Sequence, residues 1–400
     1  MHAEGIVARI LRPCLAELHT KRVAALIGAT AALLRGGITS LSAIALYLGR
    51  GIALKHRLKS IDRLLGNGAL YRQRCELYRR LAQQWLYDVK QWLIVVDWSD
   101  VTADQRWQWL RASVVVEGRS VTLYEEVHPR HKFGNPRVHR AFVRRLASIV
   151  PAGGQVIVMT DAGFHAPWFK LIAAQGWQFI GRIRGKNRLK VGETGPWIAA
   201  REWYRRAGSE VRDLGAGLYA RSNPVAVRAV LARRPSQGRH RLNIYGKKRK
   251  GCASAKCARR AREPWLLVSS PGLNHLAAAT LVGLYAQRMR IEQSFRDTKN
   301  TRLGLGLEAA RSRSTMRFEM LLLLAHLASF VQRLIGESAK AQQLELQFMA
   351  SRRPRRREIS VLTLGRRILD LAPHCLQRLR PWRAIPLLGA QAARALMVAG

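Results

Sequence analysis

Two short apolar runs that each reach an aspartate constrain the fold of this chain more than any other feature of its sequence. The first, WLIVVDWSD, contains its first acid at Asp97, and the second, QVIVMT, is followed directly by Asp161. Runs of this length and composition are typical of strands buried in a sheet. We therefore predict that Asp97 and Asp161 each end a buried strand. Asp100 is a rival to Asp97, but it lies three residues further on and is expected beyond the strand end.

The segments around these runs predict a mixed α/β sheet. Trp107–Glu117 and Ser120–Val127 are extended runs joined by a short glycine turn, which predicts a β-hairpin. The elements expected after the hairpin are a basic helix, a strand, a helix, two further strands and a long apolar helix: Val138–Ile149, Gln155–Thr160, Ala166–Gln175, Trp177–Arg182, Trp265–Ser269 and Thr315–Ile335.

Residues 1 to about 90 are expected to be helical, because their apolar residues recur at helical spacing. Within them, Ser40 or Ser42 is expected to cap a helix in Ile38–Gly49, and Lys55–Asn67 is expected to form a basic helix after a glycine turn. This pair suits a helix-turn-helix whose basic helix lies against DNA. A plain helical bundle with a basic solvent-facing side is the alternative.

The charge balance indicates a polyanionic partner. The 400-residue chain carries 69 Lys and Arg against 25 Asp and Glu, a formal charge of +44. Such a surface repels itself unless phosphates neutralise it, so nucleic acid is the expected partner, although GC-rich coding also enriches Arg. Five scattered cysteines do not form a disulfide framework. Without an expected signal peptide or membrane span, we predict a cytoplasmic protein.

Residues 184–262 have a different texture. Short β-like pieces, Val225–Leu231 and His240–Tyr245, alternate with glycines and basic runs, and no acid occurs between Asp213 and Glu263. The run KKRK occupies 247–250. We predict an inserted, partly β subdomain with a very basic face; a disordered basic loop is the alternative. Cys252 and Cys257 are expected to be free thiols rather than zinc ligands.

A polar constellation lies on a helix expected to run from about His275 to Thr298. In YAQRMRIEQSFRDTK, helical geometry brings Tyr285, Arg288, Glu292 and Lys299 within about 60° of one another. A face that carries a carboxylate, two cations and a phenol suits the joint binding of a metal ion and phosphates. This arrangement requires one unbroken helix.

Three carboxylates, Asp97, Asp161 and Glu292, therefore stand out among few acids. If they converge, they offer the hard oxygen ligands that suit Mg²⁺ or Mn²⁺. Two such ions support in-line displacement at a phosphodiester. Any one of these acids, considered alone, could instead have a structural role, as a helix cap, in a turn or in a salt bridge.

The order strand with Asp97, hairpin, strand with Asp161, insertion and helix with Glu292 resembles the ribonuclease-H-like core of DDE transposases. The spacing of Tyr285, Arg288, Glu292 and Lys299 matches the Y-(2)-R-(3)-E-(6)-K signature of the IS4 family of insertion-sequence transposases. The segments DWS, DAGF and GLGLE are similar to blocks of that family. The resemblance covers about residues 90 to 335.

The resemblance implies a role for each matched residue. Asp97, Asp161 and Glu292 would be catalytic and would hold two Mg²⁺ or Mn²⁺ ions, while Tyr285, Arg288 and Lys299 would contact DNA. It also implies that an aromatic side chain of the insertion stacks on a flipped base. Trp197 and Trp203 are candidates, with core packing as the favoured alternative for both.

The implied fold is an α/β ribonuclease-H-like mixed sheet with a β-rich insertion and an all-α N-terminal domain. The expected domains are a helical DNA-binding domain, the first part of the catalytic core, the insertion, the second part of the core and a basic helical C-terminal region: 1–90, 91–183, 184–262, 263–335 and 336–400.

The implied activity is cleavage at insertion-sequence ends and joining of those ends to target DNA. The implied partners are double-stranded DNA, namely terminal inverted repeats and target DNA, and a second copy of the chain in a homodimeric synaptic complex. The implied location is the bacterial cytoplasm, in association with the nucleoid. Two alternatives stay open: a metal-dependent nuclease of the same fold, and an inactive or domesticated transposase-derived DNA-binding protein.

Overall fold

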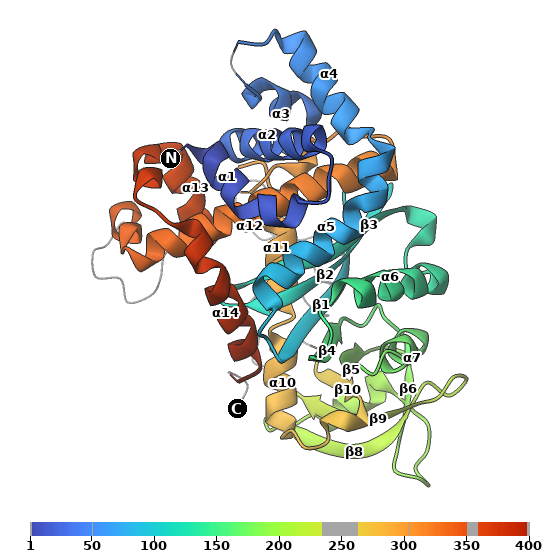
Figure 1. The fold of residues 1–400 in the computed structure, drawn as a ribbon. Coiled ribbons are helices and arrows are strands. Elements are labelled where there is room, and N and C mark those ends of the chain that lie inside the picture. The colour runs from blue at the N-terminus through green and yellow to red at the C-terminus, as the bar shows by residue number, and fades with distance from the viewer. Residues whose placement is uncertain (1, 50, 234–262, 303, 350–358, 398–400) are drawn as a thin grey trace, which may run out of the picture. The chain divides into compact units, whose positions relative to one another are not determined.

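The computed structural model describes residues 2–49, 51–233, 263–302, 304–349 and 359–397 (Figure 1). These form two compact units, one of residues 1–154 with 289–395 and the other of residues 155–288 with 396–400. Helices and strands mix in the chain, so the predicted α/β class is confirmed. The expectations for His240–Tyr245, for KKRK at 247–250, for Cys252 and for Cys257 lie outside the described residues.

The first unit opens with five helices: α1 (Ala3–Leu11), α2 (Thr20–Gly36), α3 (Leu41–Tyr47), α4 (Leu54–Leu65) and α5 (Gly68–Leu86). Gly37 ends α2 in the left-handed conformation, with φ of 65°, and its N–H bonds to the Leu33 carbonyl. Of the two candidate caps for α3, Ser40 is the one used, because its hydroxyl accepts the N–H of Ala43 at 3.3 Å. The helical N-terminal region is thus confirmed, while its contact with DNA stays a prediction.

Three antiparallel strands follow: β1 (Gln91–Asp100), β2 (Trp107–Val116) and β3 (Arg119–Pro129). The β2–β3 turn contains Gly118 at φ of 70°, as the hairpin required. The expected end of β1 was wrong: pairing with β2 continues past Asp97 to Asp100, which lies opposite Gln108. Asp97 therefore follows the buried part of the strand directly and does not end the strand.

Two helices cover opposite faces of this three-stranded sheet. On the side that we call the α6 face, α6 (Pro136–Ile149) packs Phe142 against Tyr124 at 5.4 Å between ring centroids. On the α11 face, α11 (Met289–Lys299) packs Phe295 edge-on against Trp109 at 4.8 Å. Side chains alternate along a strand, so neighbouring residues of β1 serve different faces.

The remaining helices of this unit are α12 (Thr315–Ala341), α13 (Val361–Leu371) and α14 (Ile385–Met397). Among the described residues, α12 is the one single helix long and apolar enough to cross a bilayer, and 94% of its most apolar window is buried inside the protein. The helices α2 and α3 pass the same test only as a pair bent by 95°. Short 3-10 turns lie at Arg12–Leu15, Arg130–Lys132, Leu307–Ala309, Leu344–Phe348, Pro373–Gln377 and Pro381–Ala384.

The second unit contains seven strands within the described residues, in the order β4-β5-β10-β9-β8-β6-β7. They are β4 (Gln155–Thr160), β5 (Gln178–Ile183), β6 (Arg188–Val191), β7 (Ile198–Ala199), β8 (Arg212–Tyr219), β9 (Val225–Ala232) and β10 (Trp265–Ser269). The pair β4–β5 is parallel and the other pairs within the unit are antiparallel. Its helices are α7 (Ala166–Ala173), α8 (Ala200–Trp203) and α10 (Ala278–Ala286), with 3-10 turns at Tyr204–Arg206 and Pro271–Leu273.

The described part of the expected insertion is β-rich and joins its sheet to the rest of the unit through the pairing of β9 with β10. Trp203 is buried, with 6% of its surface exposed, whereas Trp197 is partly exposed. The five-part division of the chain stays a prediction, because the two units combine segments from several of its parts.

Candidate functional site

Strand alternation places Asp97 on the α11 face. Asp97 lies opposite Arg111 in the β1–β2 register, and paired residues on neighbouring strands point to the same side. Arg111 donates from Nη2 to the Thr298 hydroxyl of α11 at 3.3 Å, so the α11 face is the side to which both side chains belong. Trp98, the next residue, serves the α6 face, where its indole Nε1 donates to His139 Nε2 at 3.1 Å.

A direct contact joins the helix of Glu292 to the aspartate-bearing strand. The Lys299 ammonium donates to the Ser99 hydroxyl at 2.8 Å, across 200 residues of sequence. Burial lowers the pKa of Lys299, and the carboxylates of Asp100 and Glu308 act in the opposite direction. Glu292 lies seven residues before Lys299, almost two full turns, so both project from the same side of α11.

The opposite side of α11 is fastened to the β2–β3 hairpin. The Arg290 guanidinium donates to the Val116 carbonyl at 2.6 Å, and Arg119 donates from Nε to Asp297 Oδ2 at 2.6 Å. Burial raises the pKa of Asp297, against the lowering effect of Arg119. These contacts hold the helix against rotation about its axis, and that rotation sets the direction in which Glu292 points.

A hydroxyl pair adds to this attachment. The hydroxyls of Ser120 and Ser294 lie 2.9 Å apart, and the Ser120 N–H donates to Ser294 Oγ at 3.3 Å. No local pattern in the sequence indicates this set of positioning residues. Their partners lie 174 to 187 residues away, so only the pairing of distant segments reveals them.

The expectation of one unbroken helix through Tyr285 and Lys299 was wrong. The segment forms two helices: α10 ends at Ala286 and α11 begins at Met289. Arg288 lies in the turn between them, where its N–H bonds to the Tyr285 carbonyl at 3.0 Å. The four signature residues therefore do not share one helical face. The sequence concealed the break because helix-compatible residues continue through it, without a proline or glycine.

Tyr285 and Arg288 belong to the second unit. Tyr285 is 3% exposed, and its ring packs edge-on against Trp265 of β10 at 4.9 Å between centroids. The Arg288 guanidinium lies 6.0 Å from the centre of the Tyr285 ring. The aromatic ring thus forms part of the packing beside the arginine.

Asp161 also belongs to the second unit, directly after β4. Its Oδ1 accepts the N–H of Gly163 at 2.8 Å, which fixes the carboxylate in a tight turn. Asp97 is held in a similar way, because its Oδ1 accepts the N–H of Trp98 at 2.8 Å. Of the predicted site residues, the first unit contains Asp97, Glu292 and Lys299, and the second contains Asp161, Tyr285 and Arg288.

The donor set fits a hard divalent cation in its chemistry. Asp97, Asp161 and Glu292 all offer carboxylate oxygens, which Mg²⁺ and Mn²⁺ prefer to nitrogen or sulfur. Across the described parts of the chain, no three His, Cys, Asp or Glu side chains are grouped closely enough to hold a metal ion. The fit therefore rests on ligand type and on the backbone N–H groups that hold the two aspartate side chains.

A family comparison covers the segments just described. The family model described as the transposase DDE domain matches residues 89–330, more than half of the chain and a span that runs from just before β1 into α12. No curated protein matches the chain. Domains of this family generally use divalent metal ions and act on DNA. With the two strand aspartates, the Glu292 helix and this match in place, the chain belongs to the DDE transposase family.

Proposed function

We propose that this protein is an IS4-type transposase that cuts DNA at the ends of an insertion sequence and joins those ends to target DNA. The observation that carries the proposal is the Lys299–Ser99 contact. It connects the last residue of the predicted signature to the DWS block that contains Asp97. An ammonium group at this position supplies a point charge that suits a phosphate beside the carboxylates.

The catalytic fold in this proposal is ribonuclease-H-like. The antiparallel set β1–β2–β3 and the parallel pair β4–β5, each within its own unit, supply the strand directions that such a core requires. The described strands β6 to β9 then form the β-rich insertion of that core.

In the proposed site, Asp97, Asp161 and Glu292 hold two Mg²⁺ or Mn²⁺ ions. When bound, such ions activate an attacking oxygen and stabilise the charge on the leaving oxygen. Lys299 and Arg288 neutralise phosphate oxygens of the DNA, the lysine as a point charge and the arginine as a two-pronged donor. Tyr285, which is 3% exposed, contributes to DNA binding by packing beside Arg288.

The proposed reaction has two steps. Water attacks the phosphodiester at the end of the element, the bond to the 3′ oxygen breaks, and a free 3′-hydroxyl and a 5′-phosphate result. That 3′-hydroxyl then attacks a phosphodiester of the target, so a new bond forms as another breaks, and no covalent enzyme intermediate is needed. The positioning contacts of α11 keep Glu292 in place through both steps.

The proposed partners follow from this chemistry. The protein would bind duplex terminal repeats and target DNA in the bacterial cytoplasm, and a homodimer would hold two ends together. A nuclease of the same fold would cut without joining, and an inactive transposase-derived DNA-binding protein would bind without cutting.

One assay separates these functions. Purified protein is incubated with DNA that carries the terminal repeats bordering its gene, with Mg²⁺ or Mn²⁺ and a supercoiled target plasmid. The proposal expects both cut ends and joined products, and Asp161→Asn should remove both while duplex binding persists. Cut ends without joined products would favour the nuclease, and an Asp161→Asn variant that cuts normally would refute the assignment of this ligand.

A further inference from the structure

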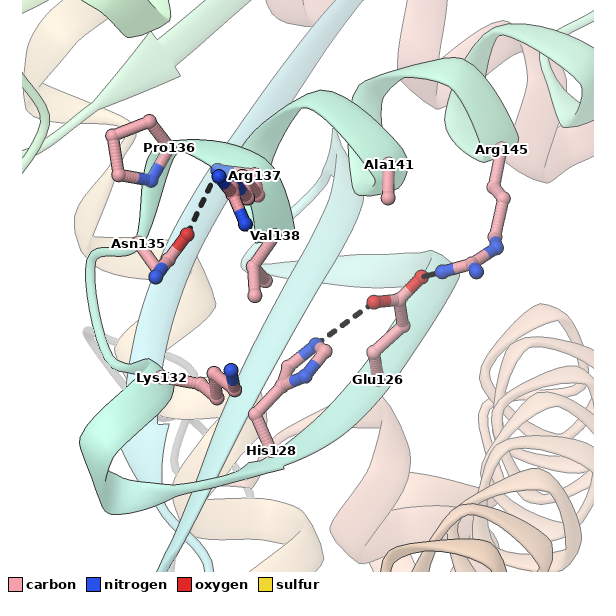
Figure 2. Close-up of a pocket in the computed structure, with 9 residues that line it drawn as sticks. All are labelled: Glu126, His128, Lys132, Asn135, Pro136, Arg137, Val138, Ala141 and Arg145. Atoms are coloured by element: carbon pink, nitrogen blue, oxygen red, sulfur yellow. Dashed lines mark hydrogen bonds and ion pairs between the residues drawn. The ribbon is translucent and has the colours of Figure 1, made fainter.

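A basic pocket lies on the α6 face, away from α11 and its contacts with β1. It has a volume of about 540 Å³ and opens between the end of β3 and the start of α6 (Figure 2). Three cations and a histidine line it, together with one acid: Lys132, Arg137, Arg145, His128 and Glu126. None of them has a role in the chemistry proposed above.

The carboxylate of this pocket is already paired with basic side chains of the protein. Glu126 is 1% exposed, and its carboxylate accepts from Arg145 at 2.5 Å and bonds to His128 Nε2 at 2.8 Å, as Figure 2 shows. Although burial alone would raise the pKa of Glu126, His128 and Arg145 lower it overall, so the group stays ionised and paired. Glu126 and Arg145 offset each other, and the charge left in the pocket is positive.

Lys132 and Arg137 supply that charge. Both are exposed, and within the described residues neither side chain has a hydrogen bond or an ion pair to the protein. The N-cap of α6 is satisfied separately, because Asn135 Oδ1 accepts the Arg137 N–H at 2.8 Å. An anion in the pocket would therefore be bound by the two long side chains rather than by the end of the helix.

The basic surface continues along α6. Arg137, Arg140 and Arg144 recur at spacings of three and four, so they lie within about 60° of one another around the helix. All three are exposed, and the sequence of α6 contains no acid. A row of cations at this spacing complements a chain of phosphates rather than one small anion.

The topology places this row near the strand of Asp97. β1 and β3 both run antiparallel to β2, so they run parallel to each other and their carboxyl ends, Asp100 and Pro129, lie at the same edge of the sheet. Ser99, which binds Lys299, is at that edge on the α11 face. Lys132 and Arg137 follow Pro129 closely and lie at the same edge on the α6 face.

We infer that the pocket and the α6 row bind the sugar–phosphate backbone of duplex DNA that lies across this edge. One phosphate sits between Lys132 and Arg137, and the neighbouring phosphates follow Arg140 and Arg144. The inference rests on the proposed function, and it adds a second DNA-contacting surface to the one at Lys299.

The test uses the full-length double variant Lys132→Gln/Arg137→Gln and a fluorescently labelled duplex. Binding is measured by anisotropy from about 50 to 200 mM salt, the range over which counterion release dominates affinity. Loss of two phosphate contacts should reduce the slope of log K against log salt by about 2 and weaken binding roughly tenfold. The matched control, Arg378→Gln/Arg394→Gln, removes the same charge from exposed positions outside the pocket.

Each outcome decides the matter. An unchanged slope in the pocket variant overturns the inference, and so does an equal loss in the control, which would mean that only net charge matters. Weaker binding of polyglutamate with unchanged DNA binding would assign the pocket to an acidic protein instead.

Failure of the wild-type protein to bind any duplex would refute the proposed function itself, whereas normal cutting by a pocket variant with an unchanged slope would refute this inference alone. Circular dichroism and a urea titration check that each variant is folded.

Discussion

The two faces of the three-stranded sheet use their cations in opposite ways. On the α11 face, Arg111 and Arg119 each donate to a carboxylate of the protein, and Arg111 is buried with its Nε 2.8 Å from Glu125 Oε2. On the α6 face, the exposed side chains of Lys132, Arg137, Arg140 and Arg144 have no hydrogen-bond or ion-pair partner in the part of the chain that the structure describes. Paired, buried cations fix the position of a helix, whereas unpaired, exposed ones are left for a ligand. The same residue types therefore serve different purposes on the two sides of one sheet.

The largest expected effect tests where the chemistry lies. Glu292→Gln should lower the rate of DNA cleavage by about a thousandfold, because a metal-binding carboxylate contributes several kcal/mol of transition-state stabilisation. Duplex binding should change by less than about twofold, since a neutral isostere removes no phosphate contact. Single-turnover cleavage and anisotropy measure the two quantities. Glu308→Gln makes the same change at an exposed acid nearby, and an equal loss there would remove the distinction between the two glutamates.

A second change breaks the pairing that holds the α11 face. Arg111→Met leaves Glu125 buried without its cation, although Trp109 still donates to it at 2.9 Å. We expect the free energy of unfolding to fall by about 3 to 5 kcal/mol, as measured by urea denaturation. Arg140→Met, on the α6 face, should change it by less than about 0.5 kcal/mol. Similar values for the two variants would contradict the contrast between the faces.

The pH dependence of stability gives a third test of the buried side. His326 of α12 is buried against Tyr78, with ring centroids 5.2 Å apart, and burial lowers its pKa from 6.5 to about 3. The unfolded chain takes up a proton between these values and the folded chain does not. The contribution of neutral His326 to the free energy of unfolding is therefore present in full above about pH 6.5, and it is lost as the pH falls towards 3.

From about pH 7 to pH 5, this one group should lower the free energy of unfolding by about 2 kcal/mol. Urea titrations at the two pH values measure the difference, and the His326→Phe variant should lose that part of it. The control is His131→Phe, at an exposed position near the pocket, which should keep the full pH dependence. A wild-type protein and a His326→Phe variant with the same pH dependence would show that the imidazole is not the cause.

The smallest expected effect concerns the start of α6. Asn135→Ala removes the side-chain acceptor of the Arg137 N–H and should lower the free energy of unfolding by about 1 kcal/mol. The Lys132→Gln/Arg137→Gln variant should leave stability unchanged within about 0.5 kcal/mol. Thermal unfolding of both variants compares them directly. A large loss of stability in the double variant would mean that its cations are structural, as on the α11 face.

The sequence predicted best where the signal is local. The helix α4, the hairpin around Gly118 and the strands β1 and β4 follow from short-range periodicity and turn chemistry, and each was placed to within a few residues. The acids Asp97, Asp161 and Glu292 were singled out by their positions relative to those elements. Their joint action at a metal site stays a prediction, because it depends on how separate segments meet.

The sequence by itself determined the fold class, the high positive charge and the positions of the candidate acids, since composition and short-range spacing are written along the chain. Only the tertiary structure decided that the helix of the signature breaks between Tyr285 and Met289, and that Lys299 reaches Ser99. It also decided which cations are paired with acids and which stay exposed. The reason is that helix breaks and ion pairs depend on contacts between residues far apart in the sequence, and local periodicity does not encode those contacts.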